Sequence, residues 1–440
     1  MKNCENYIIA IEEKYVSRAA LVGLLQDSHE AYVYLLEREY IKPGKGNEFA
    51  FSFVGVISFK DKVICVLPKY YQEVTYSCDR QISEFATVIK VLKKIGRINE
   101  IPDSNNLSSN EYVNLTEVVL ADKFLRDYLD YGIYNKTSNT LVLNGGGETN
   151  WDNSINRLNP VFTKRRPIYS EVYTSSTITE QYNIVTELHK WVVKYCLQRF
   201  GRILDYKFSY LEDCVSDVLD LGSIEYIKTS IRRELNVTYT DREILLLKRL
   251  LAFLDKVRDD NTESFNLYGT GYFHVIWEKV CGSFLNNRID DFPNQMPSPK
   301  WNDRTGKSVS KSTLKPDVIS TMEGEASKLF IFDAKYYNLH YSSEGDLKVS
   351  DNPGVEDVSK QFLYAEAFKN VSYAKKYNCF LFPKIGPDFF YVVGSVTFAI
   401  FNETVIHNIF LSPDMLFQAY LHNSPVSTSL LKGIADALES

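Results

Sequence analysis

The chain has 440 residues and a formal net charge of −6, so it lacks the overall positive charge that is typical of proteins that bind nucleic acid over a broad surface. Hydrophobic residues make up 45% of the chain, which is enough for buried cores, and the length predicts about two or three domains. The seven cysteines form no CxxC pair, and no apolar run approaches the ~18 residues of a membrane span. We therefore expect a cytoplasmic globular protein with reduced thiols and with no disulfide framework, zinc site or membrane segment.

The N-terminal part of the chain predicts two helices around a β-hairpin. Residues 17–40 have rough helical spacing behind Ser17, a candidate N-cap. Two strand-like runs follow at residues 51–59 and 63–67, and the polar turn between them predicts a hairpin. Apolar residues on one face predict a second helix at 83–96.

The middle of the chain is mostly helical in pattern. A polar loop at 102–110 precedes a predicted helix at 116–131, which ends at Gly132, a residue suited to a left-handed helix end. Three glycines that follow a short strand at 141–144 lack the spacing of a phosphate-binding fingerprint, so we interpret them as a turn. From residue 177 to residue 259 the pattern is helical again.

Basic residues gather in a loop at 297–315, directly before an acidic motif. Binding to a phosphate backbone needs such a local basic patch, so we expect the loop to contact DNA through Lys300, Arg304, Lys307, Lys311 and Lys315. The loop also contains the sequence Gly306-Lys307-Ser308, but Trp301 stands where a P-loop requires its first glycine, and a strand follows instead of a helix. We therefore expect this chain to bind no nucleotide itself.

The stretch from Leu314 to Tyr337 carries the strongest chemical signal. Four bulky apolar residues at 329–332 predict a strand buried on both faces, and Asp333 and Lys335 share one face at its end because side chains alternate along a strand. If the preceding run pairs with this strand as a hairpin, Asp317 converges on Asp333. Two carboxylates and an ammonium at one point are costly unless something uses them, and a divalent metal would. The alternative is an ordinary hairpin with a surface ion pair between Asp333 and Lys335.

This arrangement, Pro316-Asp317 followed by Asp333-Ala334-Lys335, resembles the motif of the PD-(D/E)xK nucleases. The resemblance implies that the two aspartates and the backbone carbonyl of Ala334 hold Mg²⁺, with Mn²⁺ as an alternative. It also implies that Lys335 orients and activates the attacking water or stabilises the phosphorane. Mg²⁺ prefers such hard oxygen ligands and keeps several waters.

Two further residues match positions of that superfamily. Glu278 lies in a predicted helix at 272–286, where the superfamily usually carries an acid ahead of the metal-binding strands. Gln361 lies in a predicted helix at 359–368, after the D-x-K strand, where it would orient the lysine or the metal-bound water. The alternatives are a solvent-facing glutamate, and a helix that packs on the sheet with its glutamine exposed.

Three stretches together, 51–71, 269–278 and 315–336, resemble McrC-type restriction subunits, and among them the LlaJI group of McrC-like restriction endonucleases. The similarity covers nearly the whole chain. It implies a phage-defence nuclease that cuts double-stranded DNA with an McrB-like AAA+ GTPase ring as partner, whose GTP hydrolysis it stimulates. The hairpin at 51–71 is the candidate partner contact, with a plain hairpin in a small barrel as the alternative. Dimerisation of nuclease domains on assembly is left open.

We therefore predict an α+β multidomain protein. It would consist of a partner-engaging β-rich domain with a hairpin or small barrel at 1–165, a helical segment at 166–262, and an α/β PD-(D/E)xK restriction-endonuclease-like core at 263–440. The predicted function is Mg²⁺-dependent DNA cleavage as a subunit of an McrBC-like restriction system. The alternatives are a degenerate adaptor that only activates the GTPase and a nuclease that acts without a partner.

Overall fold

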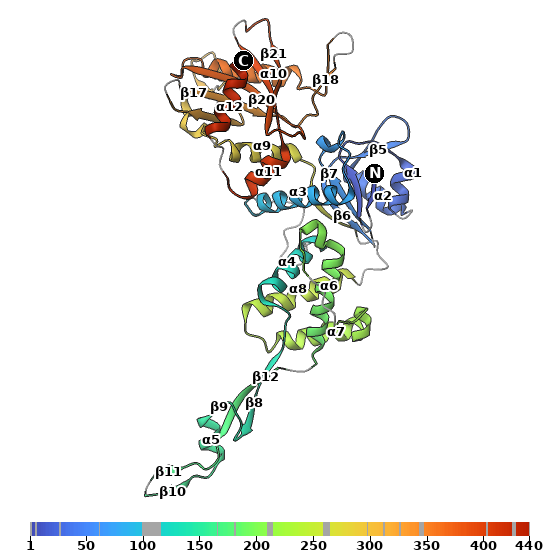
Figure 1. Ribbon diagram of the computed structural model, residues 1–440, viewed down its shortest axis with the longest axis vertical. Helices are drawn as coiled ribbons and strands as arrows, with labels where there is room; N and C mark the ends of the chain where they lie inside the picture. The colour runs from blue at the N-terminus through green and yellow to red at the C-terminus, as the bar shows by residue number, and fades with distance from the viewer. Residues whose placement is uncertain are drawn as a thin grey trace. The chain divides into compact units, whose positions relative to one another are not determined.

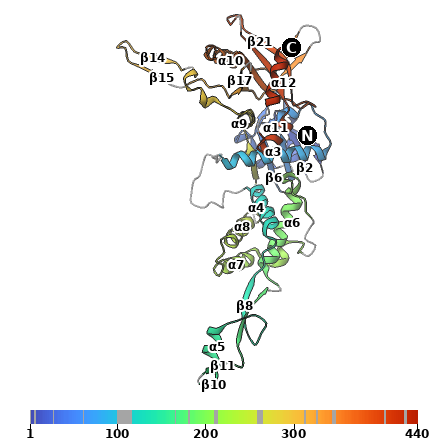
Figure 2. The same ribbon diagram turned by 60° about the vertical axis from the view of Figure 1, so that its left-hand side comes forward.

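The computed structural model describes residues 2–4, 7–25, 28–60, 62–98, 116–164, 166–179, 182–208, 214–257, 265–296, 298–310, 313–324, 327–342, 347–401, 404–424 and 428–439. The chain forms a mixed α+β protein with two compact units (Figures 1 and 2). Unit 1 comprises Met1–Leu107, Ile203–Asp205 and Phe265–Ser440, and unit 2 comprises Ser108–Arg202 and Tyr206–Ser264. The polar loop predicted at 102–110 lies outside the described residues.

The first sheet of unit 1 joins segments from both ends of the chain. Its strand order is β1 (Lys2–Cys4), β2 (Tyr7–Ile11), β7 (Lys62–Leu67), β6 (Val54–Phe59) and β13 (Phe265–Thr270). The antiparallel β6–β7 pair confirms the predicted hairpin. Because β13 pairs with β6, the grouping differs from the three predicted segments, which separated residues 1–165 from residues 263–440. Gly55 of β6 faces Gly269 of β13 so closely that a Cβ on Gly55 would lie 2.2 Å from the Tyr268 carbonyl oxygen.

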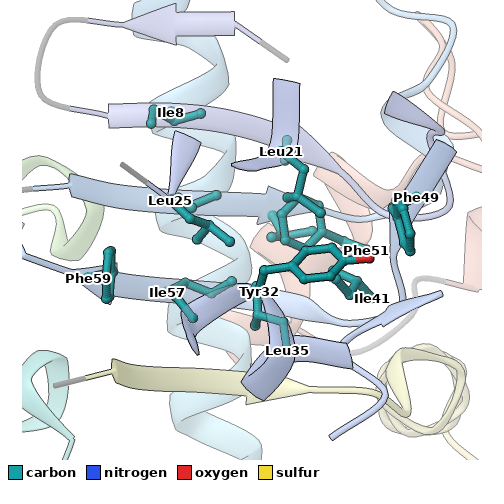
Figure 3. Close-up of a cluster of buried hydrophobic side chains, with 14 of the residues drawn as sticks. Ile8, Leu21, Leu25, Tyr32, Leu35, Ile41, Phe49, Phe51, Ile57 and Phe59 are labelled. Carbon is teal, nitrogen blue, oxygen red and sulfur yellow. The ribbon is translucent and has the colours of Figure 1, made fainter. Parts of the chain in front are cut away.

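The prediction of one helix at 17–40 is wrong, because the chain forms two. Ser17 caps α1 (Arg18–Leu24) by accepting the Ala20 amide, and Ser28 starts α2 (His29–Glu37) by accepting the Ala31 amide. Both helices pack their apolar side chains on the first sheet and on the small sheet formed by β3 (Val16–Ser17), β5 (Glu48–Phe51) and β4 (Ile41–Pro43) (Figure 3). Each helix thus has its own serine N-cap, and the second cap, Ser28, starts a new helix within the predicted one.

A disulfide joins Cys4 of β1 to Cys78, the first residue of α3 (Cys78–Ile98). The expectation that every thiol is reduced is therefore wrong for this pair. The other described cysteines are free, and those at 65, 196, 281 and 379 are buried. The two bonded residues are 74 positions apart in the sequence, so no spacing motif marked them. Helix α3 itself confirms the helix predicted at 83–96 and begins earlier.

The second sheet of unit 1 has the order β16 (Val318–Met322), β17 (Lys328–Ala334), β20 (Lys375–Pro383), β22 (Val405–Leu411) and β21 (Phe390–Thr397). Helix α10 (Val355–Ala367) packs on it through Phe362 and Tyr364. The other helices of this part are α9 (Phe273–Phe284), α11 (Pro413–Leu421) and α12 (Thr428–Glu439). Short 3-10 turns lie at η1 (Lys69–Tyr71), η3 (Ile289–Asp291) and η4 (Pro293–Gln295), and two-stranded hairpins at β14 (Lys300–Asn302) with β15 (Ser308–Ser310) and β18 (His340–Ser342) with β19 (Lys348–Ser350).

Unit 2 combines a helical body with a β-ribbon (Figure 1). The helices are α4 (Glu117–Tyr131), α6 (Ile184–Leu204), α7 (Ile224–Leu235) and α8 (Asp241–Val257), with a short turn η2 (Val218–Leu221). Helix α4 ends at Gly132 as predicted, with φ 76°. The ribbon contains β8 (Thr137–Leu143), β12 (Tyr173–Thr179), β9 (Glu148–Thr149), α5 (Trp151–Arg157), β10 (Val161–Thr163) and β11 (Arg166–Ile168). The helical pattern predicted from residue 177 therefore begins with the end of a strand. In the described part of the chain, no helix is long and apolar enough to cross a membrane.

Candidate active site

Strand β17 places the acidic motif at the end of a fully buried strand. All seven of its residues are buried, as the run of bulky apolar side chains predicts. Its neighbours are β16, in antiparallel register, and β20, in parallel register. The β16–β17 register pairs Val318 with Phe332, which confirms the predicted hairpin. One step further along, Asp317 lies opposite Asp333.

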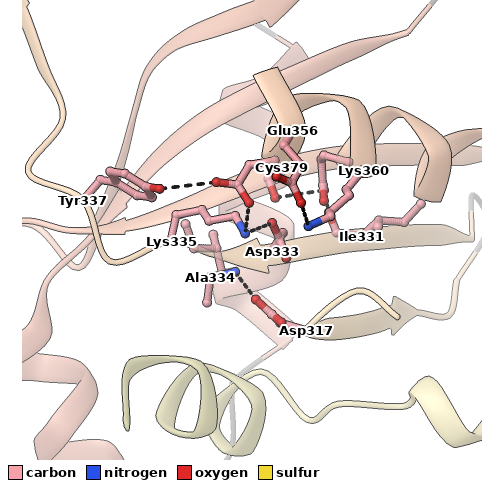
Figure 4. A network of polar contacts seen from close by, with 12 residues as sticks. Asp317, Ile331, Asp333, Ala334, Lys335, Tyr337, Glu356, Lys360 and Cys379 are labelled. Atoms are coloured by element: carbon pink, nitrogen blue, oxygen red, sulfur yellow. Dashed lines mark hydrogen bonds and ion pairs between the residues drawn. The ribbon is translucent and has the colours of Figure 1, made fainter. Parts of the chain in front are cut away.

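The carboxylate of Asp317 is bonded to the backbone at the end of this strand pair. Its Oδ2 accepts a hydrogen bond from the backbone N–H of Ala334 at 2.7 Å (Figure 4). Asp317 and Asp333 also lie within hydrogen-bonding reach of each other. The structure therefore brings together Asp317 and Asp333, the two carboxylates that the sequence predicts to converge.

Lys335 stands between two acids. Its Nζ lies 2.7 Å from Oδ2 of Asp333 and 3.1 Å from Oδ1 of Asp357 (Figure 4). Asp357 lies in the first turn of α10 and also accepts the Tyr337 hydroxyl at 3.3 Å. The sequence analysis missed Asp357, because it started this helix at residue 359 instead of Val355. The acidic pair Glu356-Asp357 at the helix start was the available signal.

The electrostatics of the site reflect four acids around Lys335. Burial, together with the charges of Asp333 and Glu278, raises the pKa of Asp317 to about 8. Burial also raises the pKa of Glu278, against the opposing effect of Lys335 and with a further contribution from Asp333. Burial lowers the pKa of Lys335, but Asp333 and Asp357 outweigh it, so the pKa is raised overall and the lysine stays protonated. The structure thus brings Glu278 to the site.

Helix α9 is fixed to the second sheet by buried polar contacts on both sides of Glu278. The Trp277 indole N–H donates to the Leu381 carbonyl at 3.3 Å, and the Ser320 hydroxyl donates to the Leu285 carbonyl at 2.6 Å. Just beyond the helix, the Asn287 side chain donates to the Asp317 carbonyl at 2.7 Å. These bonds hold the helix that carries Glu278 against the strand that Asp317 precedes.

Gln361 is not brought to the site. It is fully buried, and its Nε2 lies 2.7 Å from Oδ1 of Asn378, 3.2 Å from the Ile331 carbonyl and 3.3 Å from the Cys379 carbonyl. These acceptors belong to β17 and β20, so Gln361 ties α10 to the sheet instead of orienting Lys335. Tyr364, one turn later, lies nearer the acids: burial and the charges of Asp333 and Asp317 raise its pKa to about 12.

The donor set fits a magnesium ion. Within the described residues, no group of three His, Cys, Asp or Glu side chains forms a ready-made metal site. Mg²⁺ needs less, because one or two carboxylates usually suffice and waters complete its shell. Asp317 and Asp333 supply two hard oxygen donors, and a cation would counter both causes of the raised pKa of Asp317, first its burial and then the charge of Asp333.

The predicted basic loop is an exposed β-hairpin. Every residue from 298 to 310 is exposed, including Trp301 at 66%. Asp303 closes the turn by accepting hydrogen bonds from the Thr305 hydroxyl and from the amides of Lys307 and Thr305, and these bonds lower its pKa. Within the hairpin, the cations are Lys300, Arg304 and Lys307. Lys315 is exposed on the way to Asp317, whereas Lys311 lies outside the described residues.

A cavity of about 660 Å³ opens beside Ala334 and Lys335. Glu278 of α9, Lys335 directly after β17 and Asp357 of α10 line it, together with Glu12 and Lys69 from the turns that follow β2 and β7. Its walls therefore come from segments more than 300 residues apart in the sequence.

The family model described as LlaJI restriction endonuclease matches residues 53–414. The type II restriction enzyme BsuMI component YdjA of Bacillus subtilis is 31% identical over 411 residues, covering 89% of this chain and 85% of that protein. Two solved structures are also similar. The half-complex from the tetradecameric assembly of Thermococcus gammatolerans McrB AAA+ hexamers with bound McrC has a TM-score of 0.38 and 12% identity, covering 95% of this chain and 99% of that chain. The cryo-EM structure of the Thermococcus gammatolerans McrBC complex has a TM-score of 0.27 and 13% identity, covering 62% and 85%.

The raised pKa of Asp317 predicts a specific dependence of stability on pH. Because the folded state holds this proton more tightly than the unfolded chain, ionisation of Asp317 destabilises the fold progressively from about pH 4 to about pH 8. Without divalent ions, Asp317→Asn should become more stable relative to wild type over this window, by on the order of 5 kcal/mol, since each pKa unit is worth about 1.4 kcal/mol. Urea denaturation in EDTA at both pH values measures the difference. The exposed Asp290→Asn serves as control, and parallel curves for wild type and Asp317→Asn would contradict the prediction.

Proposed function

Because the chain belongs to the LlaJI restriction endonuclease family, we propose that it is the Mg²⁺-dependent DNA endonuclease subunit of an McrBC-like restriction system, with a PD-(D/E)xK site. The observation that supports this most is the meeting of Asp317 and Asp333 at the end of β17, with Lys335 at 2.7 Å from Asp333. An adaptor without catalysis would have no use for this set.

Asp317, Asp333 and the Ala334 carbonyl would hold the Mg²⁺ ion, with Glu278 as a further direct or water-mediated contact. When bound, Mg²⁺ lowers the pKa of a water and shields the charge of the phosphate. Asp317 is held for this role through the Ala334 amide, and Asn287 fixes its backbone. The acids therefore come from three elements whose relative positions are set by the fold.

Lys335 acts as a cation in this proposal. Asp333 and Asp357 hold its ammonium, which leaves one of its N–H donors for the attacking water or the phosphate, and its charge opposes the charge that develops on the phosphorane. Its raised pKa argues against a role as proton acceptor. In-line attack on the phosphodiester breaks the bond to the 3′ oxygen and leaves a 5′-phosphate and a 3′-hydroxyl.

The β14–β15 hairpin is our candidate for a DNA contact. It carries three cations against one acid, and that acid is engaged in the turn. Lys300, Arg304 and Lys307 would bind the phosphate backbone, and the exposed Trp301 would contact bases or sugars. The hairpin leads directly through Lys315 into Asp317, so DNA held by it would lie next to the acids.

The partner contact fits the ribbon of unit 2 better than the hairpin at 51–71. Strands β6 and β7 are buried almost throughout and lie inside a five-stranded sheet, so they present little surface. The ribbon, in contrast, exposes apolar side chains on consecutive residues of β8 and along its outer part, namely Leu141, Val142, Leu143, Trp151, Ile155, Val161, Phe162 and Ile168. Such exposed apolar surface is typical of protein interfaces. We propose that it engages an McrB-like AAA+ GTPase.

Asp333→Ala should abolish DNA cleavage, since it removes a metal ligand and the closest partner of Lys335. A loss of more than about 10²-fold is expected. The measurement is plasmid cleavage with Mg²⁺, with and without an McrB-like AAA+ protein and GTP. Asp290→Asn is the matched control. Cleavage by Asp333→Ala at the wild-type rate would refute the site, and Asp333-dependent cleavage without the partner would support the stand-alone nuclease.

Replacement of Lys300, Arg304 and Lys307 by Ala should weaken DNA binding and flatten its salt dependence. Each lost phosphate contact lowers the slope of log K against log salt by about 0.9. Trp301→Ala should weaken binding several-fold at an unchanged slope, because it carries no charge. Titration of labelled DNA at several salt concentrations distinguishes the two effects. Lys432→Ala, exposed on α12, is the control, and an unchanged slope in the triple variant would exclude the hairpin from the backbone contact.

Phe162→Asp should abolish stimulation of the partner's GTP hydrolysis, because it places a charge on the most exposed apolar residue of the ribbon, which is 71% accessible. GTP turnover by the partner, with and without added chain, measures the effect. Tyr239→Asp is a matched control, since this residue is 89% exposed in the same unit but lies outside the ribbon. Full stimulation by Phe162→Asp, or equal loss in both variants, would argue against the ribbon.

A further inference from the structure

The residue after the proposed catalytic lysine is held by the first sheet. Tyr336 follows Lys335, and its hydroxyl donates to Oε2 of Glu12, in the turn after β2. The same hydroxyl accepts the backbone N–H of Lys69 at 3.1 Å, from the turn after β7. Both of its hydrogen-bonding partners thus belong to the N-terminal sheet, more than 260 residues earlier in the chain.

The ring of Tyr336 is enclosed as well as its hydroxyl. The ring centroids of Tyr70 and Phe273 lie 6.3 Å and 5.3 Å from that of Tyr336. The Lys69 ammonium lies 4.9 Å from the Tyr336 ring centroid and is held in place by Glu13 at 3.0 Å. These contacts fix the Tyr336 side chain against the turns that follow β2 and β7, so a movement of the turns would move Tyr336.

Glu12 is an unusual anchor, because it is a buried carboxyl with only 5% of its surface exposed. Its Oε2 accepts both the Tyr336 hydroxyl and the Lys69 amide, the latter at 3.3 Å. Its backbone is fixed by its amide, which donates to the Leu67 carbonyl at 2.8 Å, and by its carbonyl, which accepts the Gln72 side chain at 2.9 Å. A buried carboxyl that makes only structural contacts is costly, so its place beside the cavity calls for an explanation.

We propose that Glu12 and Tyr336 are positioning residues, through which the N-terminal sheet sets the place of Lys335 in the active site. On the other side, the Lys335 amide donates to the Leu381 carbonyl of β20 at 2.8 Å. The lysine backbone is therefore fixed between β20 and the Tyr336 anchor, while Asp333 and Asp357 hold its side chain. Neither Glu12 nor Tyr336 is placed in contact with the reacting atoms. The inference rests on the proposed function, because it assigns Lys335 a catalytic role.

The test compares kcat and KM for plasmid cleavage by the assembled system. Tyr336→Phe keeps the ring and removes the hydroxyl, and Glu12→Ala removes the acceptor. Each should lower kcat about tenfold and leave KM within about twofold, because the lysine is misplaced while DNA binding is intact. Glu12→Gln keeps an acceptor oxygen and should restore kcat to within about twofold of wild type. The double variant Glu12→Ala/Tyr336→Phe should again lose about tenfold, since both changes remove one interaction.

Tyr377→Phe is the matched control, because it also loses a hydroxyl contact, to Glu439, but lies at the far end of β20. Wild-type kcat in folded Tyr336→Phe, equal damage by Glu12→Gln and Glu12→Ala, or an effect on KM alone would each overturn the proposal. If Tyr336→Phe fails to fold, the two Glu12 variants decide. Asp333→Ala in the same assay distinguishes failure of the proposed function from failure of the positioning role. Full activity of Asp333→Ala would refute the proposed function. An inactive Asp333→Ala together with a fully active Tyr336→Phe would refute only the positioning role.

Discussion

Five residue pairs join β16 to β17, from Val318 opposite Phe332 to Met322 opposite Lys328, and this register decides where the charges of the site stand. A slip by one residue would turn Asp333 to the other face of the sheet and separate it from Asp317. Such a slip is resisted on both sides, because β17 also pairs in parallel with β20 along its whole length. Asp333 is thus positioned by backbone hydrogen bonds in the interior of the sheet, and Asp317 directly precedes the edge strand that pairs with it.

The same burial that fixes the register makes the site electrostatically strained. Asp317, Asp333 and Glu278 lie where water solvates them poorly, and the nearby ammonium of Lys335 is already shared with Asp357. Burial and, after it, the charges of Asp333 and Glu278 raise the pKa of Asp317. A divalent cation would offset the excess of negative charge. The repulsion that destabilises the metal-free fold would therefore contribute to the affinity for metal. The same group of acids thus favours metal binding and lowers the stability of the metal-free fold.

The parts of the fold that the sequence predicted are those carried by local pattern. The buried run at 329–332, the hairpin of β6 and β7, and the stop of α4 at Gly132 follow from hydrophobic periodicity and turn chemistry. What it missed depends on long-range pairing. Cys4 bonds to a cysteine 74 positions away, and the fifth strand of the first sheet pairs with a strand more than 200 positions away. Gln361 of α10 is turned toward the sheet by its hydrogen bond to Asn378, 17 positions away.

Strand β13 explains why the first and last parts of the chain act as one unit. It pairs with β6 at the edge of the first sheet, where the facing glycines Gly55 and Gly269 permit close approach, and only two residues separate it from α9. Helix α9 carries Glu278, so the strand that completes the N-terminal sheet also places an acid of the site. Tyr336 makes the return connection, from the end of the D-x-K strand to Glu12. These two links between the sheets meet where Phe273, the first residue of α9, packs on the Tyr336 ring. A displacement of the N-terminal sheet would therefore move Glu278 and Lys335 together, and the geometry of the site depends on the first sheet as much as on the second.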